Sequence, residues 1–246
     1  MKGLSVTAIG ARPLDECLNI FETLKESLGL DFLELAVGSR CDLSKIPKEI
    51  PLVIHHRCLF DGLYKLPFSL AQPETWEEYR QRLRDRNVKM ISIHPPMRKE
   101  ITFDDLKRNR DQFESLLGVP VCLEVMPNDA YWLSEDDFRT TPDRVIDIPI
   151  LLDISHLNIW AKGRSALVQE WTERLLPQAI TVHLSHNNGR RDSHDLIPSD
   201  IWFNQHIEKW ETQGLILTYE SLPESFAKFE RDDKQRMKQK LKHRVS

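Results

Sequence analysis

The sequence predicts an α/β protein built as a single (β/α)8 TIM barrel, with residues 1–246 in one domain. Three observations lead to this fold. The chain has 246 residues, a length at which α/β barrels are commonly undivided. Short β-type runs alternate with longer helical stretches from end to end, without a break or an internal repeat. The phosphate-binding patterns GxGxxG and GxxxxGKS/T are absent, which weighs against an open nucleotide-binding sheet.

Eight segments have the composition of buried parallel strands. Several contain continuous apolar runs, such as LVI, VCLEV and ITVHL, which is typical of strands covered on both faces. In chain order the predicted strands are Leu4–Ile9, Phe32–Val37, Pro51–His56, Val88–His94, Val119–Val125, Ile148–Ile154, Ile180–Ser185 and Leu215–Glu220.

Helical segments lie between these strands and after the last one. Pro13, Pro73 and Pro198 lie at or near the start of three of them, where the missing N–H of proline costs nothing. From about residue 228 the chain is highly charged, which predicts a solvated final helix or a charged tail. The predicted helices are Leu14–Ser27, Glu74–Arg86, Asp104–Leu117, Ala166–Leu176, Ser199–Thr212 and Pro223–Lys242.

The composition excludes several classes of protein. A net charge of −4 argues against a surface for duplex DNA, which needs a basic face. No window approaches the ~18 apolar residues of a membrane span, and the N-terminus lacks the pattern of a signal peptide, so we expect a cytoplasmic protein without a membrane partner. No CxxC pair occurs, which predicts reduced thiols rather than disulfides or a cysteine-rich zinc site.

Metal-competent side chains gather at the carboxyl ends of six of the eight predicted strands. In a TIM barrel these ends meet at one mouth, where active sites are found. Carboxylates such as Glu124 and Asp153 follow apolar runs, where an unpaired charge is costly to desolvate, and a shared divalent cation removes that cost. The candidate ligands are His55, His56, His94, Glu124, Asp153, His156, His183, Asp192, His194 and Glu220.

The chemistry of these donors indicates the kind of metal. They are imidazoles and carboxylates without a thiolate, a combination that suits Zn, Mn, Fe or Co. They are more numerous than one ion needs, so we expect one to three ions. Adjacent strand residues point to opposite faces, so only one of His55 and His56 faces the interior of a regular strand, and we favour His55.

The strand-end residues resemble those of the xylose-isomerase-like TIM-barrel superfamily, which contains sugar-phosphate isomerases and epimerases and apurinic endonucleases of the endonuclease IV type. The resemblance lies in LGLDFLEL, LEVMP, LLDISH, HLSHNNGRRDSH and TYESLP, of which HLSHNNGRRDSH is the most specific. It implies that Glu124, Asp153, His183 and Glu220 bind a central metal and that the other candidates complete a two- or three-metal cluster. It also implies a substrate-binding role for Glu34 in LGLDFLEL.

These features predict a divalent-metal-dependent isomerase or epimerase that acts on a small sugar or sugar phosphate through an enediolate. Glu124 and Glu220, on separate strands, are the expected catalytic residues that remove and return the proton. Arginines after strand seven are candidate partners of a phosphate or carboxylate, and tryptophans after strands five and six are candidates for an apolar wall. The further candidate substrate-binding residues are His156, Arg190, Arg191, Trp132 and Trp160.

Two other reactions stay open. The first is that of a metal-dependent phosphodiesterase of the apurinic endonuclease type, but His94-Pro95-Pro96 stands where that branch has HPG. The second is that of a multinuclear non-haem iron oxidase that modifies a peptide, a branch that shares the LLD strand and a D-x-H-D segment like residues 192–195. That branch usually has Asn at the position of His156. A barrel that only binds a metal or a partner is least favoured, because the set of candidate ligands is intact.

Overall fold

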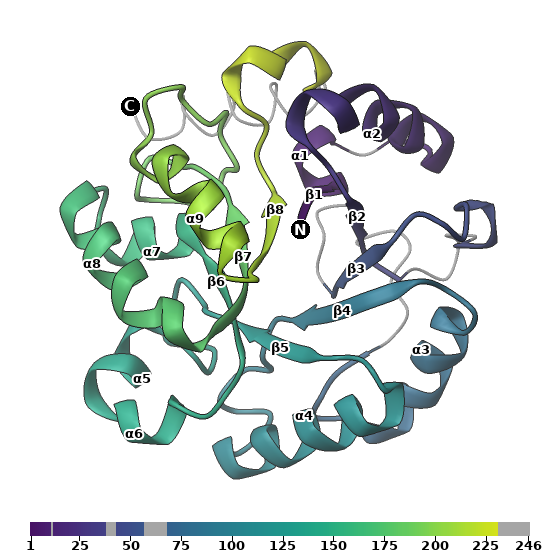
Figure 1. The fold of residues 1–246 in the computed structure, drawn as a ribbon. Coiled ribbons are helices and arrows are strands. Elements are labelled where there is room, and N and C mark those ends of the chain that lie inside the picture. Colours follow the sequence, from purple (N-terminus) through teal and green to yellow (C-terminus); the bar gives the residue numbers. More distant parts are fainter. Residues whose placement is uncertain (11, 38–42, 57–67, 231–246) are drawn as a thin grey trace.

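The structure, a computed structural model, describes residues 1–10, 12–37, 43–56 and 68–230. Eight strands in this part of the chain pair in sequence order, each parallel to its neighbours, and the last strand pairs with the first to close the barrel (Figure 1). The predicted (β/α)8 TIM barrel is therefore confirmed. The strands are β1 (Lys2–Ser5), β2 (Phe32–Leu35), β3 (Leu52–His55), β4 (Val88–Ile93), β5 (Val121–Glu124), β6 (Ile150–Asp153), β7 (Ala179–Leu184) and β8 (Ile216–Tyr219).

The first strand differs from its predicted bounds. It was expected over Leu4–Ile9, but β1 ends at Ser5 and a one-turn helix, α1 (Val6–Ile9), follows directly. The Ser5 hydroxyl accepts a hydrogen bond from the backbone N–H of Thr7 at 3.3 Å and so caps this helix. The apolar run Val6–Ile9 predicts a strand because a buried strand and a buried one-turn helix have the same composition.

Four of the predicted helices, Leu14–Ser27, Glu74–Arg86, Asp104–Leu117 and Ala166–Leu176, are present with their ends moved by a few residues. The predicted helix Ser199–Thr212 is instead a 3-10 helix over Trp202–His206 followed by an α-helix over Ile207–Thr212. Short helices also occur where none was predicted, over residues 135–160, because segments of four to seven residues are too short to show a helical period. The α-helices after α1 are α2 (Leu14–Leu28), α3 (Trp76–Leu83), α4 (Phe103–Leu117), α5 (Glu135–Thr140), α6 (Pro142–Val145), α7 (Ile154–Trp160), α8 (Ser165–Leu175) and α9 (Ile207–Thr212). The 3-10 helices are η1 (Leu43–Lys45), η3 (Pro73–Thr75), η4 (Leu176–Gln178), η5 (Trp202–His206) and η6 (Glu224–Phe229).

Some sequence predictions concern segments that the structure describes only in part. Of the predicted helix Pro223–Lys242, the described part contains only η6, and the remainder lies outside it. Cys17 and Cys122 are buried thiols, whereas Cys41 and Cys58 also lie outside it. Among the described residues, no helix combines the length and the apolar composition needed to cross a bilayer.

The barrel interior is apolar at the amino ends of the strands and polar at their carboxyl ends. Five fully buried residues form the apolar floor: Phe32, Val53, Met90, Cys122 and Leu151. Side chains alternate along a strand, so the residue two positions later also faces the interior. Those later residues are Glu34, His55, Ser92, Glu124 and Asp153, each of them at most 1 % exposed. The floor therefore supports a layer of polar and ionisable side chains at the mouth of the barrel.

Candidate metal centre

His55 and His56 point in different directions at the end of β3. The ring of His55 lies edge-on to that of His183 with centroids 5.0 Å apart, and its Nδ1 shares a hydrogen bond with the Ser92 hydroxyl at 2.8 Å. His56 instead packs edge-on against Phe68 at 4.9 Å, next to an aromatic cluster of α3 and α4. The structure thus brings His55 into the polar layer and leaves His56 on the helix side of the strand.

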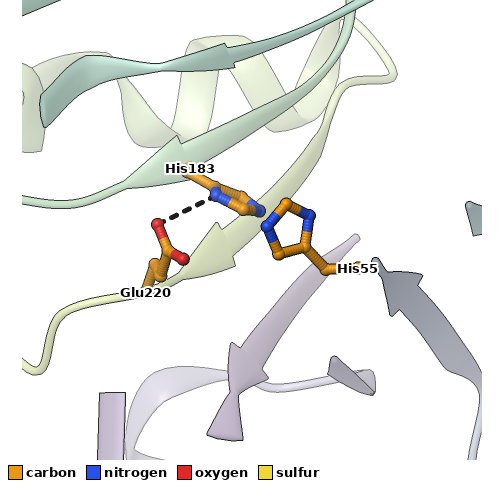
Figure 2. A group of neighbouring side chains, drawn as sticks. All are labelled: His55, His183 and Glu220. Atoms are coloured by element: carbon orange, nitrogen blue, oxygen red, sulfur yellow. Dashed lines mark hydrogen bonds and ion pairs between the residues drawn. The ribbon is translucent and has the colours of Figure 1, made fainter. Parts of the chain in front are cut away.

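His183 has carboxylates on both edges of its ring, three in all among the residues that the structure describes. Its Nδ1 is 3.0 Å from Oε2 of Glu220, as Figure 2 shows, and 3.7 Å from Oδ2 of Asp153. Its Nε2 is 3.0 Å from Oε2 of Glu34, on the opposite edge of the ring. The side chains of His183 and Glu34 are both fully buried. Glu34, predicted to bind substrate, therefore lies on the edge of the His183 ring opposite Glu220.

Glu124 is surrounded by three imidazoles. Its Oε2 lies 2.7 Å from Nε2 of His94 and 3.6 Å from Nε2 of His55. Its Oε1 lies 3.5 Å from Nδ1 of His156, which shares a 2.7 Å hydrogen bond with the carbonyl of Val125. These contacts bring residues from β3, β5 and the segments after β4 and β6 around one carboxylate.

The backbone and side-chain environment orients Asp153. Its Oδ1 accepts hydrogen bonds from the backbone N–H groups of Ser155 and His156, at 2.6 and 3.3 Å, and so caps α7. The Ser185 hydroxyl donates to the same oxygen at 2.7 Å. The other oxygen, Oδ2, is buried and has no hydrogen-bond partner among the described residues. A buried carboxylate oxygen left in this state fits a metal ligand, because a cation would satisfy it.

The loop after β7 adds Asp192 and His194 to the layer. Oδ2 of Asp192 lies 3.3 Å from Nε2 of both His156 and His194, and its Oδ1 accepts a 2.9 Å hydrogen bond from Ser155. Nδ1 of His194 lies 3.5 Å from Oε2 of Glu220. His194 has a φ of 44°, in the left-handed region that non-glycine residues rarely adopt. The loop therefore directs two more donors toward the mouth.

Burial shifts the pKa values of the carboxyl groups in different directions. It raises the pKa of Glu124 to about 8 and that of Glu220 to about 7, although neighbouring histidines oppose the shift. Burial also acts to raise the pKa of Asp153, but His156 and His183 outweigh it and lower this pKa below its usual range. The layer thus combines carboxylates that are held ionised, such as Asp153, with two carboxyl groups, Glu124 and Glu220, that titrate near neutral pH.

The imidazoles are also held in different charge states. Burial acts to lower the pKa of His183, but Glu34 and Glu220 outweigh it and raise this pKa well above its usual value. Burial lowers the pKa of His55 well below its usual value, and the nearby His183 adds to the effect. His55 is therefore a neutral imidazole, the form that binds metals.

Among the described residues, three sets of donors converge closely enough to hold a divalent cation. Within each set, one ligand atom from every residue lies within 4.8 Å of the others. Two residues belong to two sets each, so the layer has donors for more than one ion. The imidazole and carboxylate composition fits Zn, Mn, Fe or Co. The sets are His55–His183–Glu220, which Figure 2 shows, His55–His94–Glu124 and Glu124–Asp153–His156.

The two tryptophans proposed as an apolar wall make their described contacts elsewhere. Trp132 donates its indole N–H to the carbonyl of Ile101 at 3.0 Å and stacks under the guanidinium of Arg98 at 4.5 Å. Trp160 is buried and donates to the carbonyl of Met126 at 2.8 Å. Neither makes a described contact with the three donor sets, and both contribute to packing.

The two candidate anion-binding arginines are exposed. Arg190 and Arg191 lie in the loop that leads to Asp192. The backbone N–H of Arg190 donates to Oδ1 of Asn188 at 3.1 Å, which orders the turn before them. Their side chains are accessible at the rim, outside the buried layer.

Sequence reasoning missed the serines that orient the donors. Ser92 contacts His55, Ser155 contacts Asp192, and Ser185 contacts Asp153. A signal existed for Ser92, which is two residues before His94 and therefore on the same face of an extended strand. Ser185 follows His183 by two residues in the same way.

Comparison with known proteins gives matches by structure. No sequence-family model matches the chain, and no curated protein sequence matches it. The IolI protein with a bound zinc atom superposes with a TM-score of 0.53 at 12% identity, covering 97% of this chain and 95% of that one. An AP endonuclease, family 2, from Brucella melitensis gives 0.58 at 12% identity and covers 91% and 92%. D-allulose 3-epimerase from Methylomonas sp. in complex with D-allulose gives 0.52 at 11% identity and covers 93% and 88%.

These structures are members of the xylose-isomerase-like TIM-barrel superfamily. The resemblance inferred from the strand-end motifs is therefore confirmed at the level of the fold. At 11–13% identity, the similarity extends to the fold and not to a particular reaction.

Proposed function

We propose that this chain is a divalent-metal-dependent isomerase or epimerase of a small sugar or sugar phosphate, with Glu124 and Glu220 as its proton-transfer groups. One observation carries the proposal: the donor sets include two buried carboxyl groups, Glu124 and Glu220, which come from the ends of separate strands. In the metal-free site, burial raises the pKa of Glu124 to about 8 and that of Glu220 to about 7. A group that both accepts and returns protons works best when its pKa is close to the working pH. Glu124 ends β5, two residues after the floor residue Cys122, and Glu220 directly follows β8.

Each residue of the layer then has a defined task. A divalent cation held by Glu124, Asp153, His183 and Glu220 would supply Lewis-acid polarisation of the substrate carbonyl. One of the two glutamates removes the proton from the carbon beside the carbonyl. The other returns a proton to the opposite face for epimerisation, or to the neighbouring carbon for isomerisation. Asp153 remains ionised throughout, because its pKa is held low.

The structural neighbours support the class of metal and of substrate. IolI binds zinc, and the allulose epimerase binds a small sugar. On this proposal, Arg190 and Arg191 at the rim bind the phosphate of a phosphorylated substrate. We propose that the bound ion is Zn, Mn, Fe or Co.

Metal analysis followed by a substrate screen tests this function. Protein purified without added metal is expected to contain Zn, Mn or Co, measured by elemental analysis. Incubation with sugars and sugar phosphates in D2O is expected to place solvent deuterium on the carbon beside the carbonyl of the product, measured by NMR. Protein that holds metal but exchanges no deuterium with any sugar or sugar phosphate would contradict the proposed reaction.

A second candidate is supported by the number of donors. His55 and Glu124 join the three donor sets into one cluster, and Asp192 and His194 add to it. A multinuclear centre of this kind suits a phosphodiesterase of the apurinic endonuclease type or an iron oxidase that modifies a peptide. Three zinc ions per chain would favour the hydrolase. Bound iron with an oxygen-dependent change in absorbance would favour the oxidase.

Metal affinity is expected to fall as the pH falls from 8 to 6. Burial raises the pKa of Glu124 to about 8 and that of Glu220 to about 7, so lowering the pH protonates both groups and protons compete with the cation. We expect an affinity for Mn²⁺ that is roughly 500-fold weaker at pH 6 than at pH 8. Calorimetry in buffers of different ionisation enthalpy should also detect proton release on binding. An affinity that is constant across this range would show that the two glutamates do not bind the metal.

A further inference from the structure

Both ring nitrogens of His183 contact carboxylates, and only the carboxylates at Nδ1 are proposed metal ligands. Nδ1 faces the cluster, 3.0 Å from Glu220 and 3.7 Å from Asp153, both of which are proposed metal ligands. Nε2 faces Glu34 at 3.0 Å, on the far edge of the ring. Glu34 belongs to none of the three donor sets. The imidazole therefore separates Glu34 from the carboxylates of the cluster.

Glu34 also has a partner on the neighbouring strand β1. It follows the floor residue Phe32 by two positions on β2 and pairs in register with Ser5 of β1. Its carboxylate is a hydrogen-bond partner of the Ser5 hydroxyl, and the same hydroxyl caps α1 by accepting from Thr7. The register of β1 and β2 thus places a hydroxyl donor next to Glu34.

We infer that Glu34 is a positioning residue that holds the His183 ring with Nε2–H toward Glu34 itself and Nδ1 toward the proposed metal ligands. This inference rests on the proposed metal-dependent function. A carboxylate that accepts the second N–H of a metal-binding imidazole fixes its tautomer and orientation and makes it a stronger ligand. Glu34 is fully buried against the Nε2 edge of His183, so on this inference it acts through that ring rather than on the substrate.

Substitution of Glu34 by glutamine and by methionine tests this role. The glutamine carbonyl can still accept from Nε2 without the charge, whereas methionine cannot accept at all. We expect Glu34→Gln to weaken Mn²⁺ or Zn²⁺ binding by about 10- to 100-fold, with a larger loss for Glu34→Met. Calorimetry gives the affinity. NMR of protein labelled with ¹⁵N-histidine is expected to show the Nε2–H tautomer of His183 in the metal-loaded wild type and a mixture in Glu34→Met.

Val53→Ala is the matched control. Val53 is paired in register with Glu34, but it belongs to the apolar floor. This variant is expected to lower the melting temperature through a small cavity while leaving metal affinity unchanged. If Glu34→Met only destabilised the barrel, the two variants would behave alike, and the inference would be overturned.

The remaining outcomes separate this inference from the proposed function. Wild-type protein that binds no divalent metal would overturn both. Wild-type protein that binds metal, together with a Glu34→Gln variant of equal affinity, would overturn the positioning role alone. A variant with unchanged metal affinity and a raised KM would assign Glu34 to the substrate instead.

Discussion

Replacing Glu220 by glutamine is expected to abolish turnover while the barrel stays folded. Glutamine has the shape of glutamate and keeps an oxygen for the cation, but it cannot accept or return a proton at neutral pH. General acid–base catalysis by one side chain typically contributes 10²- to 10⁴-fold, so we expect kcat to fall by about 10³-fold or more. The fold should survive because glutamine fits the space of glutamate, and because burial raises the pKa of this carboxyl to about 7, so that a neutral side chain is expected there near neutral pH.

The measurement compares kcat, metal content and circular dichroism between the wild type and Glu220→Gln. Glu224→Gln is the matched control, because Glu224 is an exposed residue of η6 whose carboxylate accepts from the backbone N–H of Ser199. The control is expected to keep full activity. An active Glu220→Gln variant with unchanged metal content would remove Glu220 from the mechanism.

The fold could be predicted from the sequence because parallel barrel strands have a strong local signal. Strands covered on both faces require continuous apolar runs, and β5, β6 and β7 each show one. The failures occurred where the local signal is ambiguous. At Val6–Ile9 an apolar run forms a helix, because the Ser5 hydroxyl caps it and no periodicity marks so short a segment.

The candidate site could be predicted as a set of strand ends but not as a set of contacts. Alternation along β3 favoured His55 over His56, and the structure places His55 among the donors. Contacts across the barrel, such as Glu34 with His183, depend on register between distant strands, which one sequence does not contain. The direction of the Trp132 ring after β5 depends on its packing against Arg98, which the sequence did not reveal either.

Substitutions of Asp153 can separate metal binding from folding, because one of its carboxylate oxygens caps a helix and the other is free to bind a cation. Oδ1 caps α7 and accepts from Ser185, whereas Oδ2 has no hydrogen-bond partner in the described part of the chain. Asn keeps an oxygen for the cap and replaces the other with an NH2 group, which cannot bind a cation. We therefore expect Asp153→Asn to lower the affinity for a divalent metal by about 100-fold or more while the chain remains folded. Calorimetry with Mn²⁺ and urea unfolding give the two quantities.

Asp153→Ala should differ from Asp153→Asn, because alanine removes both oxygens. Loss of the cap is expected to cost about 0.5–2 kcal/mol of unfolding free energy in addition to the loss of metal. Thr102→Ala is the matched control, because the Thr102 side chain caps α4 by accepting from the backbone N–H of Asp105 at 3.2 Å. This variant is expected to have a lower free energy of unfolding and an unchanged metal affinity. If Asp153→Asn bound metal as tightly as wild type, Oδ2 would not be a ligand. If Asp153→Asn were instead as unstable as Asp153→Ala, the division of work between the two oxygens would be wrong, because the acceptor that caps α7 would still be present.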